Sequence, residues 1–121
     1  MRAGWWIAAA AGAVLWPGPA AGAPRVGTAI GVSEREFRIA VYRPRVAPGP
    51  VRFNVTNFGQ DVHDLVVIAP GGRVVGRSGE LRAGARVAVA ARLSRPGRYT
   101  LVCTKADHAA RGMLARLRVV R

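Results

Sequence analysis

Apart from residue 1, the chain carries four side chains that bind soft metal ions well. Cys103, His108 and Met113 lie in one run of eleven residues, and His63 lies forty residues before Cys103. The sequence has one Cys, two His and two Met in all, so every Cys and His belongs to this group. A thiolate, two imidazoles and a thioether are together the ligand set of a mononuclear blue-copper site. The residue types therefore predict a metal site suited to copper.

Each of these residues also has a plain structural interpretation when it is taken alone. A Met at the start of a strand usually belongs to the core, a single His is usually a core or surface residue, and a lone Cys often behaves as a small buried hydrophobe. Their joint occurrence favours a metal site over four unrelated positions. The sulfur donors favour copper, although zinc can occupy the same ligands. A binuclear copper centre is excluded because it needs two Cys.

The N-terminal segment has the layout of a secretory signal peptide. Arg2 is followed by an uncharged apolar run, Gly4 to Leu15, and then by small residues up to Ala23. This order predicts cleavage at residues 20–23. The apolar run is shorter than the ~20 residues of a spanning helix, and an uncleaved anchor is the alternative. We therefore expect a signal peptide over residues 1–23 and a single domain over residues 24–121, long enough for one core.

Export would place the domain in the periplasm or another extracytoplasmic compartment. Small domains in such oxidising compartments usually pair their cysteines. Cys103 is the only Cys, so no internal disulfide can form. A lone Cys in that setting is either a liability or a ligand. Metal ligation would protect the thiolate from oxidation, which favours the second interpretation.

The chain is strongly basic, with 19 Lys and Arg against 6 Asp and Glu and a net charge of +13. Such a charge steers a protein toward acidic surfaces. Export and the absence of interleaved aromatic and basic residues argue against a nucleic-acid partner. We expect an acidic redox partner, such as a cytochrome, oxidase or reductase, or an anionic membrane surface. The alternative is compositional bias, because every basic residue except Lys105 is Arg. A monomer is expected.

Short alternating runs broken by Pro and Gly predict strands, and no helical periodicity is present. The predicted strands cover residues 37–41, 51–56, 65–68, 87–93, 99–103 and 113–119. Three Pro make residues 43–50 a loop or an irregular edge, and residues 107–115 could form a short helical turn ended by Gly112. Turn signals at regular intervals and seven to eight strands predict an all-β, Greek-key β-sandwich.

The period of two in these strands places the metal-binding side chains at one end of the sandwich. Cys103 ends its strand on the same face as Leu101, and Met113 opens the next strand on its core face. If these strands are neighbours, the loop between them can return His108 toward both sulfurs. His63 precedes the 65–68 strand and could reach the same end.

Two motifs in the chain carry a family resemblance. The first is Asn57-Phe-Gly-Gln-Asp-Val-His63-Asp-Leu-Val-Val, after an alternating strand, and the second is Pro96-Gly-Arg-Tyr-Thr-Leu-Val-Cys103, continued by His108 and by Gly112-Met113. They resemble the cupredoxins, the family of plastocyanin, azurin and rusticyanin. The C-x4-H-x4-M spacing is one that cupredoxins use, closest to rusticyanin-like and related small bacterial members. The resemblance covers residues 26–121, and the second motif is the more specific.

The resemblance implies a role for each donor. His63 and His108 would bind one copper ion through imidazole nitrogens, Cys103 through a short thiolate bond, and Met113 as the weak axial ligand of a type 1 site. It also implies that Asp64 and Thr104 tie the two ligand loops together.

The chain departs from the family pattern just before the second histidine. Many members have Pro-Gly there, whereas this chain has Ala106-Asp107. The added carboxylate could form a hydrogen bond beside the site, and it puts the redox potential in doubt while leaving the ligand set intact.

A site whose strong positions are filled by protein leaves none for a substrate, so we expect a carrier of single electrons and no enzyme. A copper carrier or metallocentre-assembly protein is the alternative, and a metal-free interaction domain is a third. The resemblance implies that electrons pass through the solvent edge of His108. The residues around that edge would be Ala106, Ala109 and Ala110, bordered by Lys105 and Arg111, and an acidic partner would dock there.

Overall fold

The computed structural model describes residues 4, 11–16, 18 and 27–121. The predicted signal peptide and its cleavage site fall largely on residues 1–3, 5–10, 17 and 19–26, outside the described part. Nine strands form in the described residues: β1 (Thr28–Arg35), β2 (Arg38–Val41), β3 (Arg45–Val46), β4 (Gly49–Asn57), β5 (Val66–Ile68), β6 (Val74–Arg77), β7 (Arg86–Leu93), β8 (Gly97–Val102) and β9 (Leu114–Val119).

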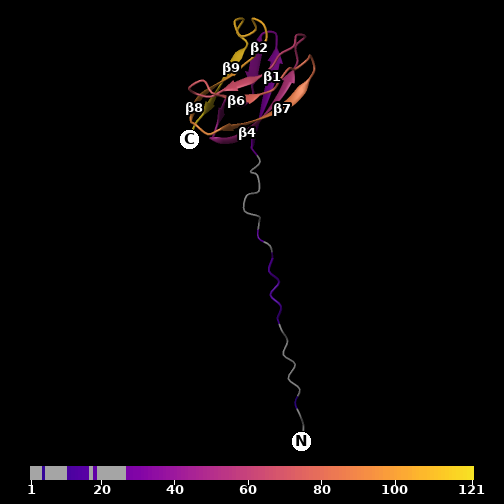
Figure 1. Ribbon diagram of the computed structural model, residues 1–121, viewed down its shortest axis with the longest axis vertical. Coiled ribbons are helices and arrows are strands. Elements are labelled where there is room, and N and C mark those ends of the chain that lie inside the picture. Colours follow the sequence, from indigo (N-terminus) through magenta and orange to yellow (C-terminus); the bar gives the residue numbers. More distant parts are fainter. Residues whose placement is uncertain (1–3, 5–10, 17, 19–26) are drawn as a thin grey trace.

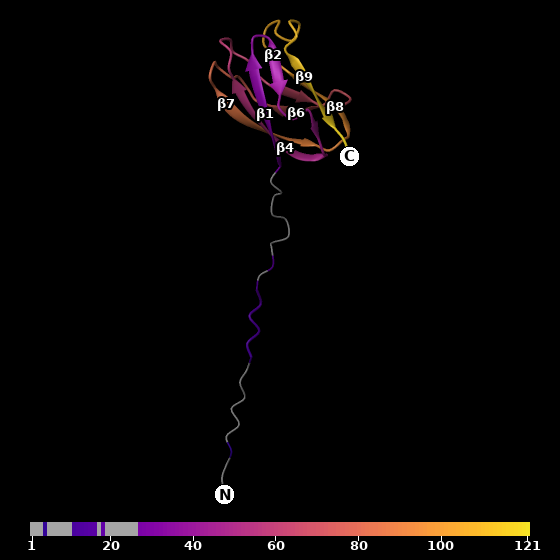
Figure 2. The ribbon, with the colours of Figure 1, turned by 180° about the vertical axis from the view of Figure 1, so that it is seen from behind.

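The strands form two sheets that face each other (Figure 1). The four-stranded sheet has the order β2-β1-β4-β7, and the five-stranded sheet has the order β3-β9-β8-β5-β6. β1 is parallel to β4 and β3 is parallel to β9, whereas the other pairs are antiparallel. The rear view in Figure 2 shows the same two layers. The predicted all-β sandwich is confirmed.

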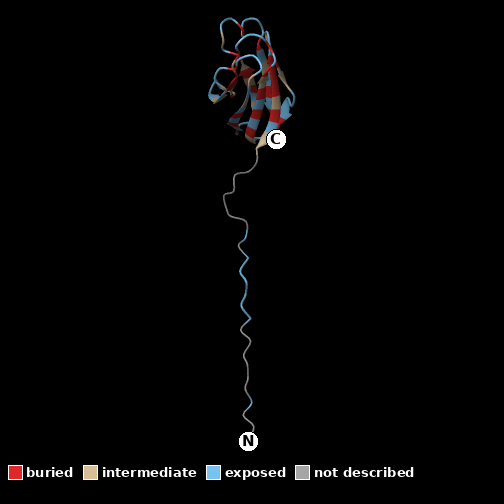
Figure 3. Ribbon diagram, turned by 90° about the vertical axis from the view of Figure 1, so that its right-hand side faces the viewer, coloured by how far each residue is buried: buried red, intermediate tan, exposed pale blue. Residues whose placement is uncertain are grey.

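Alternation along the strands builds the core, as the red and pale blue bands of Figure 3 show. In β4, Val51, Phe53 and Val55 are buried, whereas Arg52 and Asn54 are exposed. A strand that covers a core with one face and meets water with the other requires this period of two.

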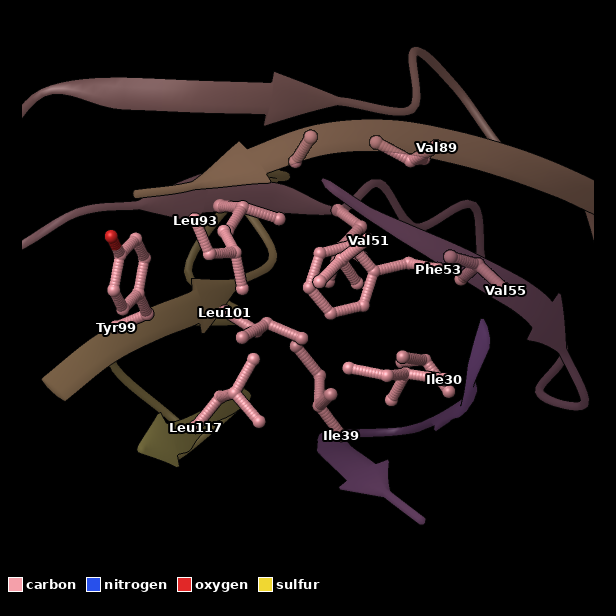
Figure 4. Close-up of a cluster of buried hydrophobic side chains, with 14 of the residues drawn as sticks. Ile30, Ile39, Val51, Phe53, Val55, Val89, Leu93, Tyr99, Leu101 and Leu117 are labelled. Atoms are coloured by element: carbon pink, nitrogen blue, oxygen red, sulfur yellow. The ribbon is translucent and has the colours of Figure 1, made fainter. Parts of the chain in front are cut away.

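The core lies between the two sheets and draws side chains from both (Figure 4). Phe53 and Leu93 come from the four-stranded sheet, and Leu101 and Leu117 from the five-stranded sheet; all four are fully buried. Each such side chain contributes roughly 1.5–3 kcal/mol through removal from water. Tyr99 is also buried, and its hydroxyl donates to the Arg95 carbonyl at 2.9 Å, which satisfies its polar end. This packing holds the two sheets together, and the ligand loops leave from one end of them.

The structure adds strands that the alternation did not predict. Residues 43–50, expected to form a loop or an irregular edge, contain the two-residue edge strand β3. β1 and β6 were not predicted. The possible helical turn near residues 107–115 is a series of hydrogen-bonded turns over 106–112 with no assigned helix. Within the described ranges, no helix is long and apolar enough to cross a membrane.

Candidate metal centre

The antiparallel pairing of β8 with β9 sets Cys103 beside Met113. Val102 is paired with Leu114, and one step further the Cys103 N–H donates to the Met113 carbonyl at 3.2 Å. Both side chains are fully buried on the core side. Directly opposed residues of an antiparallel pair have Cβ atoms about 4.5–5.5 Å apart, so the thiol and the thioether start as neighbours.

The loop between these strands turns back and places His108 beside them. Its backbone is held by the His108 N–H, which donates to Lys105, and by the Met113 N–H, which donates to the His108 carbonyl, both at 3.0 Å. Gly112, with φ near 98°, supplies the left-handed conformation that ends the turn. The imidazole of His108 is thereby held beside Cys103, with its Nδ1 at 3.5 Å from the Cys103 Sγ.

His63 lies in the connection between β4 of the four-stranded sheet and β5 of the five-stranded sheet. Its N–H donates to the Leu81 carbonyl at 3.0 Å, and the Leu81 N–H donates back at 2.8 Å. The buried Asn57 amide donates to the carbonyls of Asp61 and Leu81, each at 2.8 Å, and so ties both sides of this bridge together. The bridge holds the His63 ring, which is fully buried, against the Cys103 loop.

Three donor atoms converge at this end of the sandwich. Nδ1 of His63 and Nδ1 of His108 are 3.2 Å apart, and the Cys103 Sγ lies 3.9 Å from the first and 3.5 Å from the second. The centre of this triangle is about 2.1 Å from each corner, which matches the ~2.0–2.3 Å that nitrogen and sulfur donors keep from a metal ion. A first-row metal ion therefore fits between the atoms as they stand.

The donor set distinguishes between metals. In the described part of the chain, these three residues are the only group of three or more His, Cys, Asp or Glu that could hold an ion. Zinc prefers a fourth strong N, O or S ligand in tetrahedral geometry, and no carboxylate joins this group. A thioether beside a trigonal His2Cys set is instead the composition of a type 1 copper site.

Glu36, which no sequence motif indicated, orients His63 through the ring nitrogen that faces away from Cys103. Nε2 of His63 lies 3.0 Å from Oε1 of Glu36. The same oxygen accepts the N–H groups of Gln60 and Asp61, each at 2.7 Å. Hydrogen bonds, foremost that from the Asp61 backbone, lower the pKa of Glu36 to about 2. An ionised carboxylate only accepts, so Nε2 carries the proton and Nδ1 presents its lone pair to the metal position.

Gly59 leaves the space that Glu36 occupies. A Cβ atom at residue 59 would collide with the Glu36 carboxylate. The Gly59 N–H donates to Oδ1 of Asn57 at 2.8 Å, which fixes this close approach. The Glu36 carboxylate can therefore take its place beside the His63 loop because residue 59 has no side chain.

Asp64 and Thr104 join the two ligand loops. The Thr104 N–H donates to Oδ1 of Asp64 at 2.6 Å, and the Thr104 hydroxyl donates to the other carboxylate oxygen.

Burial raises the pKa of the Cys103 thiol, while hydrogen bonds from the Asp64 and Lys105 backbones oppose the rise. Metal coordination would supply the larger opposing effect, because a coordinating thiol is deprotonated.

Phe37 packs against His108, and Arg111 in turn stacks over Phe37. The Phe37 ring centroid lies 4.8 Å from that of His108, and the Arg111 guanidinium carbon lies 4.7 Å from the Phe37 centroid. His108 keeps 7% of its surface exposed, against none for His63. It is therefore the histidine with an edge toward solvent, and that edge is narrow.

The charges at this end are mixed. Lys105 pairs with Glu80, and Arg111 pairs with Asp107 at 2.7 Å. The Arg111 guanidinium lowers the pKa of Asp107, and the Lys105 ammonium lowers that of Glu80. Both cations that border the site are thus matched by a carboxylate.

Every acidic residue of the sequence lies at this end. Glu36, Asp64, Glu80 and Asp107 make the contacts described above, Asp61 Oδ2 lies 3.9 Å from Nε2 of His108, and Glu34 is close enough for the Asp64 charge to affect its pKa. The charged side chains on the rest of the described surface are therefore arginines.

Comparison with known proteins relates this chain to others through its fold. No known family profile matches the sequence, and no curated protein matches it significantly. Among solved structures, the reduced auracyanin of Roseiflexus castenholzii superposes with a TM-score of 0.69 at 17% identity, covering 78% of this chain and 98% of that one. Auracyanin A of Chloroflexus aurantiacus, a "blue" copper protein, gives 0.68 at 15% identity over 78% and 100%. An azurin of Methylomonas sp. strain J gives 0.64 at 15% identity over 79% and 100%.

These neighbours belong to one structural class, and the chain has the cupredoxin fold. The resemblance seen in its two sequence motifs is therefore matched by the three-dimensional arrangement of the strands.

Proposed function

We propose that this chain binds one copper ion through His63, Cys103, His108 and Met113 as a type 1 site and carries single electrons. The observation that carries the proposal is the triangle of two Nδ1 atoms and one Sγ, with sides of 3.2, 3.5 and 3.9 Å. When bound there, copper would supply one-electron chemistry by alternating between its +1 and +2 states.

The protein's contribution is to hold the donors in place. Glu36 keeps the proton of His63 on Nε2, the Asp64–Thr104 contact joins the two ligand loops, and the core excludes water from Cys103. Donors fixed in this way would rearrange little between the two charge states, which favours fast electron exchange. The same arrangement leaves no strong ligand position for a substrate, which supports a carrier over an enzyme.

Two further elements of the proposal rest on the sequence. The N-terminal 23 residues support export to the periplasm or another extracytoplasmic space. The net charge of +13 supports association with an acidic redox partner near His108. Because Lys105 and Arg111 are already paired with carboxylates, attraction would come chiefly from the charge of the whole molecule.

An absorption spectrum tests the copper site. Protein loaded with Cu(II) should show an intense band near ~600 nm from thiolate-to-copper charge transfer, bleached reversibly by a reductant. Cys103→Ser should abolish the band. Met113→Leu is the matched control, since loss of a weakly bound thioether should keep the colour and shift the potential. A colourless Cu(II) complex in the wild type would refute the type 1 assignment.

Metal exchange separates electron transfer from copper delivery. An electron carrier should retain Cu(I) in the presence of a mild chelator, whereas a copper carrier or metallocentre-assembly protein should release it rapidly. Partner docking is tested by the second-order rate of electron exchange with an acidic redox protein, which should fall as salt rises and fall further in Arg111→Glu. A rate indifferent to both would contradict the docking proposal.

A further inference from the structure

Three arginines stand side by side on the outer face of the five-stranded sheet. Arg45 on β3 is the register partner of Arg118 on β9, and Arg118 is the partner of Arg98 on β8. All three are exposed, whereas their neighbours Val46, Val119 and Tyr99 point into the core. The spacing of neighbouring strands puts the two ends of this arginine row about 10 Å apart.

The arginine row has no compensating acid. In the described part of the chain, Arg111 is the only arginine that forms an ion pair with a carboxylate, and it lies at the metal-centre end. Arg116, also exposed on β9, donates to the Thr100 hydroxyl at 3.0 Å and brings a fourth positive charge. Like charges placed directly opposite each other across strands are unfavourable, so a bound anion would relieve a standing repulsion.

The composition of this face indicates what kind of anion fits it. Protein interfaces are organised around a central buried cluster rich in aromatic side chains. Between Arg98, Arg116 and Arg118 the face carries Thr100 and no aromatic residue. A surface of arginine side chains without an aromatic centre suits a layer of lipid phosphates better than a protein partner.

The position of the row supports a membrane-facing role. Arg98 follows the first residue of β8, and Arg118 precedes the last residue of β9, so both lie at the strand ends opposite Cys103 and Met113. Figure 1 shows the C-terminus at this end of the domain and the yellow-orange loop between β8 and β9 at the other. The domain begins at this same end, where Gly27 lies against Pro50.

We propose that the face of β3, β9 and β8 carrying Arg45, Arg98 and Arg118 docks on anionic phospholipid headgroups and leaves the metal-centre end directed away from the membrane. The inference does not depend on copper, because none of these residues contacts the metal centre. It assigns a binding role to arginines that have no carboxylate partner in the described residues.

Vesicle binding of the exported protein tests the proposal. Wild type should bind vesicles of phosphatidylcholine mixed with phosphatidylglycerol more tightly than vesicles of phosphatidylcholine alone, and added salt should abolish the difference. The triple variant R45Q/R98Q/R118Q should lose about a hundredfold in its partition onto anionic vesicles, since each basic residue near such a surface contributes roughly fivefold.

The matched control is R52Q/R86Q/R92Q, which removes the same charge from exposed positions on the outer face of the four-stranded sheet. It should retain most of the wild-type partition, and thermal unfolding should confirm that both variants fold. Equal losses in the two variants would overturn the proposal, because net charge alone would then account for binding. Equal wild-type binding to both vesicle types would overturn it as well.

A fluorescent poly-glutamate peptide serves as the acidic-protein probe. Under the proposal, the arginine-row variant should bind this peptide about as well as the control variant does. Selective loss of peptide binding with unchanged vesicle binding would assign the face to a protein partner and overturn the lipid assignment.

Discussion

Glu36 accepts a hydrogen bond from Nε2 of His63 at 3.0 Å, across the gap between the first hairpin and the β4–β5 connection. The contact decides which nitrogen of His63 faces Cys103, because a ring with its proton on Nε2 has its lone pair on Nδ1. The same carboxylate oxygen holds the backbone of Gln60 and Asp61. One side chain therefore sets both the tautomer of a ligand and the loop that leads to it.

Replacement of Glu36 by Gln should weaken copper binding and raise the reduction potential. The amide can still accept from Nε2, but the negative charge that favours Cu(II) is lost, and changes to groups that orient metal ligands typically cost 10–100-fold in affinity. Competition with a copper chelator and spectroelectrochemistry measure the two effects. Glu80→Gln is the control, since it removes the same charge from a carboxylate paired with Lys105. Equal shifts in both variants would contradict a role through His63.

Gly59→Ala should have an effect in the same direction. The new methyl group would collide with the Glu36 carboxylate and push it away from His63. Copper affinity should therefore fall in the wild-type background and change little when Glu36 is already Ala, which a double-mutant cycle detects. An undiminished loss in the Glu36→Ala background would place the effect elsewhere in the β4–β5 loop.

The buried sulfur ligands of the site were predictable from the sequence, whereas the carboxylate that orients His63 was not. Cys103 and Met113 follow from residue type and a period of two, because adjacent strands bring such positions together without detailed geometry. Glu36 lies in a turn and reaches residues 24 to 27 positions away, between different loops. No local pattern encodes that contact, and an exposed carboxylate in a hairpin is ordinary in a sequence.

β1 was missed for a related reason. Ile30 and Val32 alternate correctly, but the next inward position is Glu34, which a pattern of apolar and polar residues assigns to the outside. A buried acid at an inward position therefore hides the alternation of apolar and polar residues by which a strand is recognised. β6 was missed because its four residues are exposed or only partly buried, so it has no apolar face to detect.

Phe37→Ala should lower the reduction potential by a few tens of millivolts. The Phe37 ring packs at 4.8 Å from His108 and shields it, and water admitted there would stabilise the more highly charged Cu(II) state. Phe58→Ala is the control, because the exposed Phe58 ring packs under Arg35. Voltammetry of both variants measures the shift, and a potential unchanged in Phe37→Ala would show that the ring does not limit access of water.

The predicted export has an optical signature. The three Trp of the sequence, at positions 5, 6 and 16, all precede the predicted cleavage at residues 20–23. The mature protein should therefore lack tryptophan fluorescence and absorb near 280 nm chiefly through Tyr42 and Tyr99. The full chain, retained by deletion of the export step, supplies the fluorescent control. Trp emission from an exported product would mean that the segment is kept.

Glu34 should make the protein less stable as the pH rises. Its side chain is fully buried, neither carboxyl oxygen has a hydrogen-bond partner in the described residues, and burial, with a smaller effect of Asp64, raises its pKa to about 8 from 4.5. Between these values the folded state keeps a proton that the unfolded state has released. The contribution of Glu34 is therefore complete below pH 4.5 and falls by about 1.4 kcal/mol per pH unit up to roughly pH 8.

Glu34→Gln isolates this effect, because the amide is uncharged at every pH while its shape is similar. The free energy of unfolding of the variant, measured by urea titration of metal-free protein, should be nearly level over the interval in which that of the wild type declines. At alkaline pH the variant should become more stable relative to the wild type. There the wild type must either hold a buried charge or bind a proton at a pH that disfavours it, and both lower its free energy of unfolding. Parallel curves for the two proteins would mean that another group carries the pH dependence and that Glu34 is ionised in the folded state.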